Sequence, residues 1–475
     1  MTVVQMLVAR GSDLPSRGSG PTRVDWHSTH GSASRSTGSA TPSPSVVGQA
    51  VQVPTGTPET AEPATEIVRQ LRALATPAGA AALARAAELL AARSDAVTAL
   101  TRLRAEVGVE LAGPAWGIAR QREKARAAFG ADADRLLFTG DTLEQAGRPA
   151  LADRRARRLL AGGAGSVADL GCAAGTDTMA LARAGARVVA ADRDPVAREL
   201  TLLNTVALGL ADVEVRDADV VDLVAAAEGG RVAGCDAAVL DPARRAGGRR
   251  LLDPDRWSPP WSTVTTLLER VPECVVKVAP GLDHDRVPGG VEAEWVSVGG
   301  SIVEALLWGR APSATWRRAT VVGRDGGVHE LTADSDPGLA PAGPVRGWLH
   351  EPDPAVIRSG LIAPVAAQLD ATLVDPTIAY LTSDSTTASP WVSSYPVTDV
   401  LPFNLKKLRA LLRSRGIGRV TVKKRGSPIE PETLARQLRG PGEGTAVVVL
   451  TRVAGAPTVL VCQASSGGPP RAREG

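Results

Sequence analysis

The chain has 475 residues, of which 44% are apolar and only 3% aromatic, and its formal charge is +3 at pH 7. This length allows two or three domains whose cores are filled mainly by aliphatic side chains. No apolar run is long enough to span a bilayer, no secretory signal is recognisable, and the four scattered cysteines form no C-x-x-C pair, so we predict a cytoplasmic protein without a membrane helix or metal site.

The N-terminal third contains two segments of different texture. Residues 1–61 are rich in Ser, Thr, Gly and Pro and cannot bury enough apolar surface to offset their ordering entropy. They are interpreted either as a disordered leader or as the product of a start codon assigned too early. Residues 62–160 show helical spacing, as in Ala80–Ala92, Glu123–Phe129 and the basic stretch Asp153–Leu160. We predict a helical subdomain there, without residues that suggest chemistry.

Residues 161–310 alternate apolar strands with helices, which is typical of βαβ units in a parallel sheet covered on both faces. The sheet is predicted to end in an antiparallel hairpin, Glu294–Val298 and Ile302–Trp308, joined by Gly299-Gly300. The parallel strands expected before this hairpin are Ser166–Leu170, Arg187–Ala191, Val213–Arg216, Asp236–Leu240 and Cys274–Ala279.

The sharpest motif follows the first of these strands, where Asp169, Gly171, Cys172 and Gly175 form the pattern D-x-G-C-x-x-G. Glycines let the backbone approach a ligand closely, and the helix that follows offers free N–H groups to a carboxylate. The spacing differs from the G-x-G-x-x-G of pyrophosphate binders, and an acid suits an ammonium group better than a phosphate. Both features favour the methionine part of S-adenosylmethionine over NAD. The alternative is an ordinary strand-turn-helix joint.

Acids also follow the second and third strands. Asp192 comes about twenty residues after the glycine loop, where a carboxylate can accept hydrogen bonds from ribose hydroxyls. Asp194 is the competing candidate, although it is better interpreted as the cap of a helix that begins at Pro195. Asp219 could accept from the adenine amino group, with Asp217 as the alternative. Each acid alone could be a loop carboxylate, but three at strand ends favour a cofactor site.

The fourth strand leads into Asp241-Pro242-Ala243-Arg244-Arg245, at the sheet edge where a ligand crevice belongs. Asp241 can accept a hydrogen bond from a proton-bearing nucleophile while the adjacent carbonyls orient it. Methyl transfer is an in-line displacement, so positioning supplies most of the catalysis. We therefore predict catalytic roles for Asp241, Pro242 and Arg244, and phosphate binding by Arg245. The alternative for Asp241-Pro242 is a plain turn.

Residues 311–463 are predicted to form a small α+β domain, followed by a disordered tail over residues 464–475. Its predicted elements are the helices Pro354–Gln368 and Leu405–Arg415, the strand Arg419–Lys424, and a hairpin of Thr445–Val453 and Pro457–Cys462.

This C-terminal region is strongly basic. From Leu401 to Gly475 there are 14 Lys/Arg and 4 Asp/Glu, a balance of +10, which leaves −7 for the rest of the chain. Such asymmetry predicts a polyanionic partner, with a solvated basic face as the alternative. The candidate contacts are Lys406, Lys407, Lys423, Lys424 and Arg425.

The block from Ser166 to Trp308 resembles class I S-adenosylmethionine-dependent methyltransferases, and the chain from about Glu66 resembles a bacterial group that adds a C-terminal THUMP-like domain. The resemblance implies an α/β fold with a Rossmann-like sheet, an N-terminal helical segment, a small α+β domain, S-adenosyl-L-methionine as cofactor and, because THUMP domains are associated with RNA, an RNA substrate. The matching motifs are Asp169-Leu170-Gly171-Cys172, Asp241-Pro242-Ala243-Arg244-Arg245, Trp257-Ser258-Pro259-Pro260, Val276-Lys277-Val278-Ala279-Pro280-Gly281, Asp375-Pro376-Thr377-Ile378-Ala379-Tyr380 and Val422-Lys423-Lys424-Arg425-Gly426.

Two departures from related families bear on the methyl acceptor. Many nucleobase amino-methylating enzymes have an aromatic residue where this chain has Arg244. An Asp-Pro-Pro-Arg motif is similar to RNA uracil C5 methyltransferases, but those need a cysteine near the end of the fifth strand. Here that stretch contains Lys277 and no cysteine, and Cys274 lies at the wrong end. We therefore expect a nitrogen or oxygen acceptor. Lys277 is predicted either to contact substrate or to close the sheet edge.

Three functions remain open from the sequence. The first is an RNA methyltransferase whose basic C-terminal domain binds phosphates. The second is a methyltransferase for a protein or small molecule, and the third is a binding protein that retains the fold without turnover. Retention of the cofactor acids together with Asp241 argues against the third.

Overall fold

The computed structural model describes residues 61–246, 249–251, 253–309 and 315–464. Apart from residues 61 and 464, the predicted leader and tail lie outside the described residues. The predicted helical segment is confirmed as helical, and its elements are α2 (Ala61–Leu74), α3 (Pro77–Ala91), α4 (Ala96–Val107), α5 (Val109–Phe129), the 3₁₀ helix η2 (Gly130–Asp134), α6 (Gly140–Gln145) and α7 (Pro149–Ala161). None of the described helices is both long and apolar enough to cross a bilayer.

The helical segment shares a core with the helices of the sheet. Alanine and leucine side chains of α2 to α5 pack together with Met179 of α8 (Thr176–Arg183) and Leu200 of α9 (Pro195–Leu208). Arg72 of α2 also forms an ion pair of 2.9 Å with Glu199, which is buried on α9. Burial of this apolar surface, rather than the single ion pair, holds the segment against the sheet domain.

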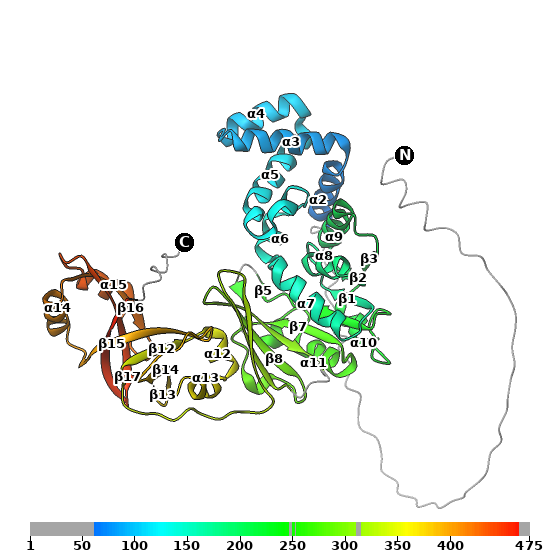
Figure 1. Cartoon of the computed structure of the whole chain (residues 1–475). Coiled ribbons are helices and arrows are strands. Elements are labelled where there is room, and N and C mark those ends of the chain that lie inside the picture. The colour runs from blue at the N-terminus through cyan, green and yellow to red at the C-terminus, as the bar shows by residue number, and fades with distance from the viewer. Residues whose placement is uncertain (1–60, 247–248, 252, 310–314, 465–475) are drawn as a thin grey trace, which may run out of the picture. The chain divides into compact units, whose positions relative to one another are not determined.

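Nine strands form one sheet in the order β11-β10-β8-β9-β7-β4-β1-β2-β3, and several of them are labelled in Figure 1. Five neighbouring strands of this sheet, β7, β4, β1, β2 and β3, are mutually parallel. β8 and β9 form the predicted antiparallel hairpin, and β9 pairs with β7. The sheet continues beyond residue 310, so the predicted domain boundary falls inside it. Its strands are β1 (Ser166–Leu170), β2 (Arg187–Asp192), β3 (Val213–Asp217), β4 (Ala237–Leu240), β7 (Cys274–Val278), β8 (Glu292–Val298), β9 (Ser301–Trp308), β10 (Arg317–Val322) and β11 (Val328–Ala333).

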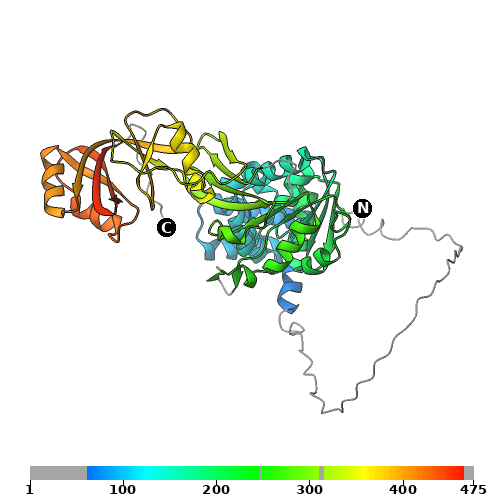
Figure 2. The same ribbon diagram turned by 90° about the horizontal axis from the view of Figure 1, so that it is seen from below.

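Helices cover both faces of this sheet, as the alternation of apolar residues requires. Val167 of β1 points to the face covered by α7 and α8, whereas its neighbour Ala168 points to the face covered by α10 and α11. Figures 1 and 2 show these layers in two orientations. The remaining elements of this part are α10 (Val220–Ala225), the short pair β5 (Arg245–Ala246) and β6 (Arg249–Arg250), η3 (Pro254–Arg256), α11 (Trp261–Arg270) and η4 (His284–Arg286).

A second sheet of seven strands follows, in the order β13-β14-β12-β15-β18-β17-β16, with only β16 and β17 parallel. The predicted helix Pro354–Gln368 is divided in two because Gly360, at φ +77°, ends the first part. The predicted helix before Gly416, the strand after it and the final hairpin are confirmed. The elements are β12 (Trp348–Pro352), α12 (Pro354–Ser359), α13 (Ile362–Gln368), β13 (Thr372–Asp375), β14 (Ile378–Ser383), β15 (Val392–Pro402), α14 (Leu405–Ser414), β16 (Ile417–Lys424), α15 (Pro431–Leu438), β17 (Gly444–Val453) and β18 (Ala456–Gln463).

Candidate active site

The glycine turn after β1 is a compact loop that leads directly into α8. Gly171 and Gly175 both have φ +83°, a region that favours glycine. A Cβ on Gly175 would also lie 3.2 Å from the side chain of Thr201, which is a tight contact. Ala173 adopts φ +50°, an uncommon conformation for a residue with a Cβ. The turn therefore presents little but backbone on the exposed side.

Asp192, at the end of β2, supports this turn. Its carboxylate accepts hydrogen bonds from the backbone N–H of Ala173 at 3.2 Å and of Asp194 at 2.9 Å. Burial nevertheless raises the pKa of Asp192 above its usual value. Asp194 caps α9 by accepting from the N–H of Val196, as predicted. Asp192 is therefore the acid at this strand end that lies against the glycine turn.

The acids after β3 have local partners. Asp219 caps α10 by accepting from the N–H of Val221 at 2.8 Å, and it lies 3.5 Å from Arg193. Asp217 is exposed and pairs with Arg198 at 2.9 Å. Asp219 thus has a structural role in addition to the adenine contact predicted for it.

Asp169 and Asp177 form a pair of buried carboxylates beneath the turn. Burial, reinforced by the charge of Asp177, raises the pKa of Asp169 to about 7. Burial alone would also raise the pKa of Asp177, but Arg155 and Lys277 outweigh it and lower that pKa. Thr178 donates a hydrogen bond to Asp169. The site thus holds one acid with a lowered pKa beside one whose pKa is raised to about 7.

Asp241 lies next to the glycine turn, as predicted from the strand order. A Cβ on Gly171 would be 3.7 Å from the carbonyl oxygen of Asp241. Oδ2 of Asp241 forms an ion pair with Nζ of Lys277, whereas Oδ1 lies 4.0 Å from the guanidinium of Arg244. Pro242 is buried behind the acid. The geometry brings the predicted acid and the predicted lysine together and leaves Oδ1 as the freer oxygen.

Lys277 lies on an inner strand, since β7 is flanked by β4 and β9, and it is not at a lateral edge of the sheet. Its side chain is only 7% exposed. Burial would lower the pKa of Lys277, but the charges of Asp241 and Asp177 raise it above the usual value. Lys277 therefore stays protonated and neutralises the acids around it.

The most important residue that the sequence did not reveal is Arg155 of α7. Its guanidinium is fully buried and bonds both Asp177, at 2.7 Å, and Glu304 of β9, at 2.8 Å. The available signal was its place on the apolar face of α7, four residues from both Leu151 and Leu159. A lone arginine at such a position indicates a buried carboxylate elsewhere in the fold.

Two buried cysteines, Cys172 in the glycine turn and Cys274 at the opposite end of the sheet from the site, are poor nucleophiles. Cys172 is buried in the glycine turn, where burial raises the pKa of its thiol and the hydroxyl of Thr201 lies 3.4 Å from its sulfur. Burial raises the pKa of Cys274 to about 12 at the start of β7. Both observations agree with the expected absence of covalent carbon methylation, because the thiolate is the reactive form.

The predicted cations of the C-terminal region fall into two groups. Lys423 pairs with Glu351 at 2.5 Å, Lys424 pairs with Glu430 at 2.5 Å, and Arg425 lies 3.8 Å from Glu351. Lys406 and Lys407, by contrast, are exposed on α14 and have no acidic partner among the described residues. The same holds for three cations that the prediction omitted, Arg413 of α14, Arg419 of β16 and Arg439 after α15. Arg245 lies in β5, and its side chain is outside the described residues.

The residues around the turn fit a cationic nucleoside. Asp169 and Asp192 are carboxylates at the carboxyl ends of neighbouring strands, and the loop between them admits close approach to its backbone. The two acids would repel a phosphate, and none of the described residues of the turn is a cation that would offset this repulsion. They would attract an ammonium or sulfonium group. The donor set therefore suits S-adenosylmethionine better than a dinucleotide.

Comparisons with known proteins agree with this fit. Two Mycobacterium tuberculosis proteins, from strains CDC 1551 and H37Rv, are described as uncharacterized S-adenosylmethionine-dependent methyltransferases; each is 36% identical to this chain over 343 residues, which cover 69% of this chain and 89% of the relative. A crystal structure of a candidate methyltransferase from Porphyromonas gingivalis W83 has the same fold, with a TM-score of 0.61 at 17% identity, and covers 75% of this chain and 91% of that chain. Residues 392–464 match the family model described as THUMP domain-like. The chain therefore belongs to the S-adenosylmethionine-dependent methyltransferases, with S-adenosyl-L-methionine as its cofactor and a THUMP-like region over residues 392–464.

Proposed function

We propose that this methyltransferase modifies RNA at a nitrogen or oxygen atom. The observation that carries the proposal is a group of exposed cations without acidic partners within the THUMP-like residues 392–464. In the same chain Asp241, the acid proposed to bind the methyl acceptor, adjoins the glycine turn of the cofactor site. The residues proposed to hold the cofactor are Asp169, Gly171, Cys172, Gly175, Asp192 and Asp219, and those proposed for substrate are Arg245, Lys277, Lys406, Lys407, Lys423, Lys424 and Arg425.

Asp241, Pro242 and Arg244 are proposed to position the acceptor. The bound cofactor supplies an electrophilic methyl group. Because Lys277 occupies Oδ2 of Asp241, Oδ1 is the atom that accepts a hydrogen bond from the acceptor's N–H or O–H. This contact directs the acceptor's lone pair along the line of displacement, where positioning supplies most of the rate. Pro242, buried beside the acid, fixes the backbone, and Arg244 is suited to a substrate phosphate.

The RNA-binding surface is proposed to centre on α14. Lys406 and Arg413 lie seven residues apart on this helix, so they fall on one face, and Lys407 adjoins them. Leu408 and Leu412 are buried on the opposite side, which fixes the orientation of the cations toward solvent. Unpaired surface cations release counterions from a nucleic acid without first breaking an internal ion pair. They should therefore contribute more to binding than Lys423 or Arg425.

We expect neutralisation of the unpaired group, in a Lys406→Gln, Lys407→Gln, Arg413→Gln variant, to weaken RNA binding and its salt dependence. Three lost phosphate contacts should reduce the slope of log K against log salt by about 2. The matched control is Lys423→Gln, Lys424→Gln, Arg425→Gln, which removes the same charge from paired positions and should change the slope by less. Filter binding or fluorescence anisotropy at several salt concentrations would measure both. Unchanged binding in the first variant would contradict the proposed surface.

The raised pKa of Asp169 predicts a pH dependence of cofactor binding. Below about pH 7 this acid is protonated in the free protein, so binding a positively charged ammonium group requires loss of a proton. We expect the affinity for S-adenosylhomocysteine to weaken as the pH falls from 7 to 5, by up to about tenfold per unit. Calorimetry at each pH measures it, and Asp169→Asn should bind weakly with a flatter profile than the wild type. Equal affinities of the wild type at pH 5 and 7 would contradict this role.

The decisive experiment is incubation of the protein with radiolabelled S-adenosylmethionine and total RNA from cells that lack the gene. Label in one RNA fraction would support the proposal and isolate the substrate. Label in protein or a small molecule, with none in RNA, would overturn the RNA assignment while leaving the methyltransferase activity intact.

A further inference from the structure

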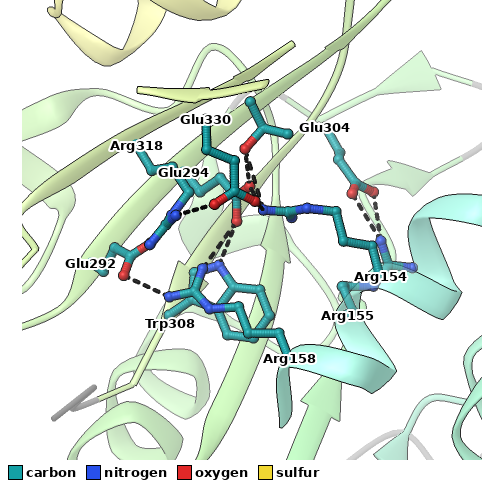
Figure 3. A network of polar contacts seen from close by, with 10 residues as sticks. Arg154, Arg155, Arg158, Glu292, Glu294, Glu304, Trp308, Arg318 and Glu330 are labelled. Carbon is teal, nitrogen blue, oxygen red and sulfur yellow. Dashed lines mark hydrogen bonds and ion pairs between the residues drawn. The ribbon is translucent and has the colours of Figure 1, made fainter. Parts of the chain in front are cut away.

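Three arginines of α7 enter two separate networks of buried charge (Figure 3). Arg154 and Arg158 join Arg318 of β10 in a closed ring with three glutamates of β8 and β11. Its ion pairs are Arg154 with Glu294 (2.6 Å) and Glu330 (2.5 Å), Arg158 with Glu292 (2.6 Å) and Glu294 (3.3 Å), and Arg318 with Glu292 (2.7 Å) and Glu330. This ring contains no residue of the proposed active site.

Arg155 belongs to the other network, which reaches the acceptor acid. One side of its guanidinium binds Glu304 and the other binds Asp177 in the first turn of α8. The second oxygen of Asp177 lies 3.9 Å from Nζ of Lys277, which in turn pairs with Asp241. Charges of alternating sign therefore run without interruption from the helical segment to the acceptor site.

Burial makes this series sensitive to each of its members. Arg155 and Lys277 are both less than 10% exposed, so neither can exchange its partners for water. Charges in such an environment interact more strongly than at a surface, and removal of one leaves the next uncompensated. If Arg155 no longer held Asp177, this carboxylate could move and draw Lys277 with it. Oδ2 of Asp241 would then lose a partner of fixed position.

We propose that Arg155 is a positioning residue for methyl transfer, which holds Asp241 in place through Asp177 and Lys277. The α7 helix thereby takes part in catalysis through Asp177 and Lys277. This inference rests on the role proposed above for Asp241.

Arg158 provides a matched control, because it lies one turn from Arg155 on the same helix and also binds buried glutamates. A purely structural role would make the two arginines equivalent in their effect on turnover. The test compares Arg155→Lys, Arg158→Lys, Asp177→Asn and Asp241→Asn in the full chain. Lysine keeps the charge but cannot bind two carboxylates with a planar fork, so it perturbs geometry more than folding.

Four quantities should be measured. Labelled methyl transfer to saturating total RNA gives kcat and the KM for S-adenosylmethionine, calorimetry gives the affinity for S-adenosylhomocysteine, and thermal unfolding gives the midpoint temperature. We expect Arg155→Lys to lower kcat by about 10- to 100-fold, as small misplacements of a reacting group do, with KM for the cofactor and calorimetric affinity within about twofold. Asp177→Asn should also lower kcat. In the double variant Arg155→Lys, Asp177→Asn, kcat should fall by less than the product of the two single effects, because both residues act through the same contact. Arg158→Lys should change kcat by less than about twofold even where it lowers the unfolding midpoint.

The results separate this inference from the proposed function. Normal kcat in Arg155→Lys with impaired Asp241→Asn would overturn the positioning role and leave the proposed function standing. Equal losses in Arg155→Lys and Arg158→Lys, or a loss of cofactor affinity that matches the loss of kcat, would also overturn it. Normal kcat in Asp241→Asn would overturn the assigned role of Asp241 and with it the inference. Label in protein instead of RNA would refute only the RNA assignment, and the same variants would then be compared on that acceptor.

Discussion

Replacement of Asp241 by Asn or Ala is expected to reduce methyl transfer by about 100- to 10,000-fold, the range in which a positioned proton-accepting group contributes to catalysis. The reason is its position: it adjoins the glycine turn, and Oδ1 is the freer of its two oxygens. Asn keeps the shape but lacks the charge that attracts both Lys277 and the acceptor's proton. Labelled methyl transfer to total RNA measures the loss, and calorimetry with S-adenosylhomocysteine should give an affinity close to that of the wild type.

The two Asp241 substitutions also distinguish catalysis from stability. Ala leaves the buried ammonium of Lys277 with Asp177, at 3.9 Å, as its nearest remaining acid partner, so this variant should unfold at a lower temperature. Asn retains a side-chain oxygen that can accept from Lys277 and should be closer to the wild type in stability. If Asn transferred methyl groups at the normal rate, Asp241 would not be the residue that positions the acceptor.

Local patterns were sufficient to predict most elements of the sheet domain. The strand Ser166–Leu170 has the bounds predicted from its apolar residues, and the helix after it in the next unit begins at Pro195, as the Asp194-Pro195 start signal predicted. The turn between strand and helix was likewise predictable, because its glycines satisfy a local conformational need at Gly171 and Gly175. These features depend on residues that are close in sequence.

The charge networks could not be predicted, because they join residues far apart in sequence. Arg155 meets Glu304 across 149 positions, and Lys277 meets Asp241 across 36. Periodicity shows which face of α7 is buried, but it does not show which acid lies opposite. The same limit affected the basic C-terminal region, where Lys423 is neutralised by Glu351, 72 residues away. Net charge counted along the sequence therefore overestimated the cations available at that position.

Glu294→Ala is expected to destabilise the protein by about 3–5 kcal/mol, as removal of one partner of a buried ion pair does. Glu294 is fully buried and bonds Arg154, Arg158 and the indole N–H of Trp308, the last at 2.7 Å. Its loss leaves an indole donor without its acceptor and two arginines with one glutamate each. Denaturant unfolding followed by circular dichroism gives the free energy of unfolding.

Glu330→Ala is the matched control, because Glu330 occupies the same ring but its side chain is 37% exposed. Arg154 keeps Glu294 and Arg318 keeps Glu292 after this change, and the partly exposed carboxylate of Glu330 is already in contact with water, so the expected cost is at most about 1 kcal/mol. If the two variants lost equal stability, burial would not govern the strength of the ring. If only Glu294→Ala is strongly destabilised, the buried Glu294 contributes more than the exposed Glu330 to holding α7 against the sheet. The ring then sets the position from which Arg155, on the same helix, reaches Asp177.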